Sequence, residues 1–242
     1  MNTNRKTAIS KATITPAKLI RWSGLAAMGT GLLYIAIQAI HPIDVLSSVT
    51  TTRWAIVHYM GIVMCMLGLL GLAGIYARQV EKAGWLGLAG YLLFSLFYAL
   101  SMAFQFIEAF LSPVLAIEAP RFVEGFLGII TKAPSEINLG ALPVVYMLAG
   151  FVGYVLGGLL FGIATFRAGS LPRWAGVVLA IGTLLPVLAS SLVPHPYDRL
   201  FAVPVGLSLV WLGYALWTER RAPVVEASLE VGRAELNRSA AD

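Results

Sequence analysis

The chain has 242 residues, of which 58% are hydrophobic and only 12% are charged, and its mean hydropathy is +0.80. A water-soluble domain carries about twice this share of charged residues, so the composition predicts an integral membrane protein. The net charge of +5 does not indicate nucleic-acid binding, because the basic residues lie in short clusters between apolar segments. The single cysteine, Cys65, excludes an internal disulfide and a multi-cysteine metal site.

The apolar segments predict an all-α, polytopic protein with six transmembrane helices in a compact bundle, since a helix needs about 20 apolar residues to cross a bilayer. We expect these helices at residues 19–40, 55–77, 84–111, 139–166, 174–193 and 200–218. The first helix is too long for the core of a typical signal peptide and should be retained. It follows a basic cytoplasmic tail, residues 1–18. The charged tail at residues 219–242 should be cytoplasmic and disordered.

The longest connection between the predicted helices is residues 112–138. Within it, "PRFVEGFLGIIT" (residues 120–131) places Phe122, Phe126 and either Ile129 or Ile130 at helical spacing. This pattern predicts a short helix that lies in the outer membrane interface.

Positive charge is distributed unequally between the two predicted faces of the membrane. Thirteen of the 17 Lys and Arg residues fall on the face that carries both termini, whereas the acidic residues divide evenly. Cytoplasmic loops carry an excess of Lys and Arg. We therefore expect both termini inside a bacterial-type plasma membrane.

Two of the apolar segments resemble each other. "RWSGLAAMGTGLLYIAIQAIHP" (residues 21–42) and "RWAGVVLAIGTLLPVLASSLVPHP" (residues 173–196) both open with Arg-Trp-small-Gly and end with His-Pro. Residues 84–108 follow a similar plan, with Glu108 in place of the histidine. The pattern predicts three repeated helical hairpins. The alternative is that Arg-Trp anchors, and Pro ends, such helices in any membrane protein.

Glycine recurs at three- and four-residue spacing along the predicted second, third and fourth helices, for example at Gly68, Gly71 and Gly74. Small residues at this spacing let helices approach closely in lipid. We expect packing within the bundle. The alternative is a face for a protein partner or for a homo-oligomer. Membrane lipids are the other expected partners.

Four polar residues fall at the predicted outer ends of helices and form a candidate outer-face cluster: His41, His58, Glu108 and His195. Imidazole and carboxylate groups are common metal ligands, and ionisable groups in membrane segments can mark ligand pathways. The alternative is that these residues only contact lipid headgroups. No cofactor is predicted, and a metal at this cluster is an alternative. We expect Arg121 or Arg199 to pair with Glu108.

Known catalytic motifs do not appear in the sequence, and no predicted helix carries a charge at its centre. The first functional hypothesis is therefore a non-enzymatic accessory or regulatory membrane protein. The second is binding or transport of a small apolar molecule or lipid in the outer half of the bundle. Its site would add four lining residues to His58 and Glu108: Tyr98, Phe104, Gln105 and Tyr146. The third is a metal-dependent membrane enzyme that uses the outer-face cluster.

Overall fold

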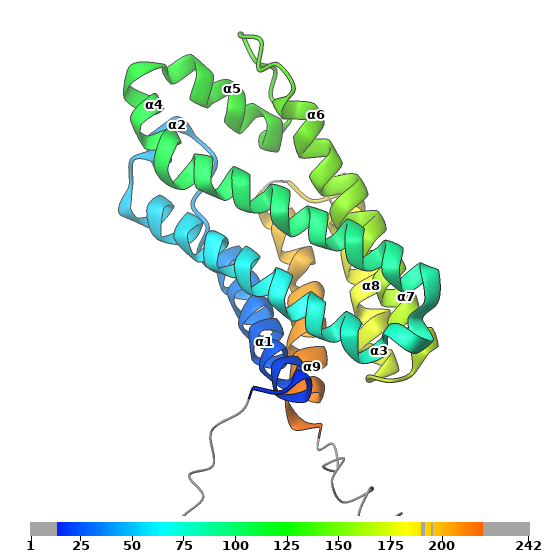
Figure 1. The fold of residues 1–242 in the computed structure, drawn as a ribbon. Coiled ribbons are helices and arrows are strands. Elements are labelled where there is room, and N and C mark those ends of the chain that lie inside the picture. The colour runs from blue at the N-terminus through cyan, green and yellow to red at the C-terminus, as the bar shows by residue number, and fades with distance from the viewer. Residues whose placement is uncertain (1–13, 190–191, 195, 220–242) are drawn as a thin grey trace, which may run out of the picture.

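The computed structural model describes residues 14–189, 192–194 and 196–219, and the helices in this part of the chain pack side by side (Figure 1). No strand occurs among these residues, so the predicted all-helical class is confirmed for them. Four helical stretches are long and apolar enough to cross a membrane. They are Pro16–Ile40, Thr52–Glu118, Leu142–Ala168 and Tyr197–Thr218. These stretches suggest a membrane protein.

Helix α1 (Pro16–Ile40) has a clear physical start and end. The Thr15 hydroxyl accepts a hydrogen bond from the Lys18 backbone N–H at 3.2 Å, which caps the first turn. The helix ends before His41, which is extended, because the ring of Pro42 disfavours a helical conformation in the residue that precedes it.

Helix α3 (Thr52–Phe106) is bent back on itself at Gly84 (Figure 1). Gly84 has φ of +58°, a conformation that costs little only for glycine. We call residues 52–83 the first arm and residues 85–106 the second arm. The expected loop after residue 77 is wrong, because residues 78–83 continue the helix and Gly84 alone makes the turn. Arg78, Glu81 and Lys82 are charged, but all three are good helix formers.

Short elements cover one end of the molecule. They are α2 (Leu46–Val49), the π-helical turn η1 (Ile107–Leu111), α4 (Ser112–Glu118) and α5 (Pro120–Thr131). A helix thus forms over the residues where the apolar spacing predicts one. Its apolar face does not lie free for a membrane interface, because Val123 and Leu127 pack in a buried cluster with Val49 and Trp54. We call this end of the molecule the cap end.

The second half of the chain contains α6 (Leu142–Met147), the π-helical segment η2 (Leu148–Leu156), α7 (Gly157–Ala168) and α8 (Arg173–Ala189). It closes with the 3-10 helix η3 (Tyr197–Ala202) and α9 (Val203–Thr218). The helix expected to reach residue 193 is described as far as Ala189, and it stops before residue 192, because residues 192–194 are not helical. Pro194 cannot continue a helix and disfavours helical geometry just before it.

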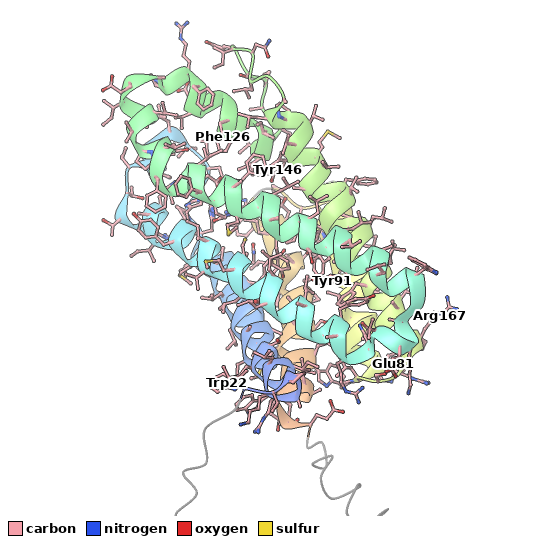
Figure 2. All side chains as sticks on the ribbon, in the orientation of Figure 1. Trp22, Glu81, Tyr91, Phe126, Tyr146 and Arg167 are labelled. Carbon is pink, nitrogen blue, oxygen red and sulfur yellow. The ribbon has the colours of Figure 1, made fainter. Side chains whose placement is uncertain are left out.

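Glycines bring neighbouring helices into backbone contact at the end opposite the cap end. A Cβ atom on Gly24 of α1 would lie 2.6 Å from the Gly213 carbonyl oxygen of α9, and one on Gly162 of α7 would lie 2.5 Å from that of Gly176 on α8. We call this end, which includes the Gly84 bend, the bend end. Figure 2 labels Trp22, Glu81 and Arg167 there. Most residues of the two expected tails, 1–13 and 220–242, lie outside the described residues.

Candidate functional site

His58 on the first arm of α3 and Glu108 in η1, which follows the second arm, meet at the cap end. The His58 Nε2 atom lies 3.3 Å from Glu108 Oε2, and both side chains are buried. The ring of His41 lies across the ring of His58, with their centroids 5.2 Å apart. Three residues of the predicted cluster therefore converge, while His195 lies outside the described residues.

A π-helical turn positions Glu108 for this contact. In η1 the Ser112 N–H bonds to the Ile107 carbonyl, five residues back, instead of to that of Glu108. The next residue is Pro113, which has no N–H to donate. The Glu108 carbonyl is thus left without a helical partner, and it accepts a hydrogen bond of 2.8 Å from the indole Nε1 of Trp54. Such π-helical turns occur frequently at functional sites.

Hydrogen bonding fixes where the protons of His58 lie. Its Nδ1 is 2.7 Å from the Trp54 carbonyl oxygen, which can only accept, so Nδ1 carries a hydrogen. Nε2 then faces a Glu108 carboxyl oxygen, and this contact is attractive only when a proton lies on one of the two atoms. At 3.3 Å the two atoms are in contact without a full hydrogen bond. The contact is favourable when the pair holds one proton, as imidazole with carboxylic acid or as imidazolium with carboxylate.

His41 occupies the first position after α1. Its Nδ1 donates to the Pro42 carbonyl oxygen at 2.6 Å. Burial of the ring, together with the nearby positive charge of Arg199, lowers the pKa of His41 to about 4. His41 is therefore neutral at pH 7 and presents an uncharged Nε2.

Asp44 and Arg199 form a buried ion pair beside these histidines. The Arg199 Nη2 contacts Asp44 Oδ2, and their side chains are 15% and 0% exposed. The expectation that Arg121 or Arg199 pairs with Glu108 is wrong: Arg199 pairs with Asp44. Arg121 lies 4.0 Å from Glu136 on the surface. Arg199 lies in η3, and Asp44 follows α1 by four residues. The two side chains meet because α1 and η3 pack together.

A cavity of about 360 Å³ lies between these groups. Its wall includes Phe104, Gln105 and Tyr146, as the sequence predicts, and also His41 and Glu108. Figure 2 places Tyr146 and Phe126, another wall residue, toward the cap end. His58 is not on this wall, and neither is Tyr98. Tyr98 is fully buried in the core, where its ring packs against Gly68 and lies 5.4 Å from the ring of Phe94.

Ionisable groups on the cavity wall gather toward the cap end, whereas aromatic rings occur along its whole length. Along α1 its wall runs from Tyr34 to His41, a rise of about 10 Å for seven helical residues. Along the second arm and η1 it runs from Phe97 to Glu108, about 16 Å by the same rise. The ionisable groups lie toward the cap end, so the cavity can take a molecule with one polar and one apolar end.

Several contributors to the site were not predicted. Trp54 supports both members of the His58–Glu108 pair, and Gln38 and Ser101 lie on the cavity wall. Gln38 and Ser101 could have been found in the sequence, because each is a polar residue in an otherwise apolar helix. Trp54 had no such signal, because aromatic residues are common at the ends of membrane helices.

Within residues 14–189, 192–194 and 196–219, no three His, Cys, Asp or Glu side chains are arranged to hold a metal ion together. Compared with protein-family models, with curated proteins and with solved structures, the chain matches none of them.

Proposed function

We propose that this chain is a six-span membrane protein that binds a small, mainly apolar molecule with a polar end in the outer half of its helical bundle. The observation that carries the proposal is the cavity of about 360 Å³, whose wall combines aromatic rings with Glu108, the partner of His58. A purely accessory protein, the first expectation from the sequence, has no need of such a cavity. The convergence of His41, His58 and Glu108 therefore favours binding.

The bend in α3 supports six spans. Each of its arms exceeds the length of about 20 residues that a bilayer requires, and the two arms run in opposite directions (Figure 1). Helix α8 has 17 residues, or about 26 Å by the helical rise. With α1, the stretch 142–168 and α9, these segments make six. Large apolar side chains such as Leu32, Leu70 and Phe151 are exposed and would face lipid.

The charge distribution supports cytoplasmic termini. The start of α1 and the end of α9 lie together at the bend end (Figure 1), and Arg78, Lys82 and Arg167 belong to the same end. The positive-inside rule then assigns the bend end to the cytoplasm and the cap end to the outside of the plasma membrane.

The local environments of two matching positions support the proposed repeat. Trp22 and Trp174 are 63% and 67% exposed. Gly24 and Gly176, two residues later, both lie against the backbone of a neighbouring helix. The Arg-Trp-small-Gly element thus has the same two uses in α1 and α8, a lipid-facing anchor and a packing contact.

Filling the cavity tests the proposed binding. Ala149 is buried on the cavity wall, and Phe151 on the same segment is 64% exposed. We expect the purified protein to carry a small apolar molecule in native mass spectrometry. The Ala149→Leu variant should lose it because the added side chain occupies the space. The matched control, Phe151→Leu, should keep it.

A second variant that fills the cavity separates loss of binding from misfolding of Ala149→Leu. Ser101→Leu adds bulk to the wall from the second arm of α3, so it should also lose the bound molecule while its elution profile stays monodisperse. Retention of the same molecule by both filling variants would place the binding elsewhere and contradict the proposal.

A further inference from the structure

We propose that the polar end of the bound molecule is a cation, and that it binds to Glu108 in exchange for the proton that Glu108 shares with His58. This inference rests on the proposed function, because it names the class of molecule that the cavity takes. The reaction is an exchange without covalent chemistry. One proton leaves the pair for solvent as one monovalent cation enters, so the total charge of the site is unchanged.

The basic groups on the cavity wall offer little to an anion. Of the Lys and Arg side chains among the described residues, only that of Arg199 lies on the wall. Its Nη2 is engaged by Asp44, and its Nη1 has no hydrogen-bond partner within the part of the protein that the structure describes. His41 is neutral at pH 7. An anionic headgroup could accept a hydrogen bond from Arg199 Nη1, but Asp44 already compensates the guanidinium charge. The headgroup would therefore lose its hydration without gaining an uncompensated positive charge.

Glu108, by contrast, can supply a negative charge that has no cation beside it. When the shared proton leaves, the pair becomes a carboxylate next to a neutral imidazole whose Nδ1 stays bonded to the Trp54 carbonyl. A carboxylate buried in this way is costly until a positive charge compensates it. Because Glu108 lies on the cavity wall, a cation in the cavity can provide that compensation.

Aromatic rings next to Glu108 add a second attraction for a cation. The ring of Phe104 lies 5.4 Å from that of Tyr146, edge to face, and 6.0 Å from that of Phe126. All three residues are on the cavity wall. The negative face of an aromatic ring attracts a cation, most strongly in a desolvated site. The cavity therefore suits an aromatic or aliphatic molecule that carries an ammonium group.

Several other ionisable groups surround Glu108. They are His58 on the first arm, His41 and Asp44 after α1, Tyr146 on α6, and Asp198 and Arg199 on η3. Asp44 and Arg199 compensate each other, and His41 is neutral. Asp198 is the other carboxylate on the wall that a cation could meet, so a variant at Asp198 tests the assignment to Glu108.

Three probes of similar shape and different charge test the inference. They are phenyltrimethylammonium, its neutral isostere tert-butylbenzene, and the anion 4-tert-butylbenzoate. Binding to the full chain is measured in one detergent by equilibrium dialysis at pH 6, 7 and 8. We expect the cation to bind at least tenfold more tightly than the anion. Its affinity should rise by up to about tenfold per pH unit while the pair holds its proton, because one proton is released per cation bound.

The Glu108→Gln variant removes the charge and keeps the shape. Its amide can donate to His58 Nε2, so the contact that stabilises the fold is retained. We expect this variant to lose binding of the cation by at least tenfold and to keep binding of tert-butylbenzene. The Asp198→Asn variant removes the other carboxylate of the wall and tests whether that group binds the cation instead. The matched control is Glu136→Gln, whose side chain is 80% exposed beside Arg121, and it should bind the cation within a fewfold of the unmodified chain.

The outcomes separate the inference from the proposed function. Failure of all three probes to bind would overturn both. Equal binding of the three charges, or binding of the cation that is independent of pH and survives Glu108→Gln, would leave the cavity as a binding site and overturn the cation exchange. Loss of cation binding in Asp198→Asn alone would overturn the assignment to Glu108.

Discussion

The bend end and the cap end of this protein use the same helices in different ways. At the bend end, glycines such as Gly162 and Gly176 place helix backbones against each other and leave no space between them. At the cap end, Gly61 faces the side chain of Gln105, and a Cβ on Gly150 would meet nothing within 4 Å. The cap end instead holds a cavity and buried polar groups. The two ends thus differ in what lies between the helices, backbone contacts at one end and a cavity with polar groups at the other.

The same substitution should have opposite effects at the two ends. Gly162→Leu inserts a side chain where a Cβ alone would come within 2.5 Å of the Gly176 carbonyl oxygen, and neither backbone can move without separating α7 from α8. We expect it to prevent folding to a monodisperse species in size-exclusion chromatography. Gly150→Leu should elute like the unmodified chain, because space is available. If both variants elute as monodisperse species, the proposed difference in helix packing between the two ends is wrong.

Ion pairs at the two ends should also differ in their contribution to stability. Asp44→Asn leaves the largely buried Arg199 guanidinium uncompensated, which should lower the free energy of unfolding by about 3–5 kcal/mol. Glu219→Gln disrupts the pair with Arg78 at the bend end, where the side chains are 26% and 29% exposed, and should cost about 1 kcal/mol or less. Denaturant titration of both variants in one detergent measures the difference. Similar losses of stability in the two variants would contradict the exclusion of water from the Asp44–Arg199 pair.

His41 should make the cap end sensitive to acid. Its pKa is about 4 in the folded protein and about 6.5 in the unfolded chain. Between these values the unfolded chain binds a proton that the folded protein does not, so stability falls as the pH falls from about 6.5 to 4. The loss is at most about 3 kcal/mol. His41→Gln removes this contribution, and its melting temperature should decline less than that of the unmodified chain between pH 7 and 5. Parallel declines would contradict a neutral, buried His41.

The sequence predicts the helices well because long apolar runs and their Pro and Gly ends are local properties. It also raises the right geometric question about His58 and Glu108, since both lie near the same predicted helix ends. The answer depends on how the two arms of α3 align, and that alignment is fixed by the turn at Gly84 and by the contact from Trp54 to the Glu108 carbonyl. Neither is visible in the apolar pattern.

Side-chain direction limits the prediction of the cavity wall in the same way. Phe104 and Gln105 lie on the wall, but Tyr98, one and a half turns earlier, turns into the core against Gly68. Apolar residues surround a membrane helix on all sides, so the sequence carries little sign of which side faces a neighbour. The partner of Arg199 was missed for a similar reason, because Asp44 is distant from it in sequence and close to it in the fold.

Photolabelling tests the central claim most directly. A diazirine derivative of phenyltrimethylammonium is irradiated with the purified full chain, and labelled peptides are mapped by mass spectrometry with and without excess unlabelled cation. The account predicts competed labelling within residues 97–108 and 146–154, which contribute the aromatic and acidic wall of the cavity. Labelling confined to lipid-facing positions such as Leu32 and Leu70, and unaffected by the competitor, would contradict it.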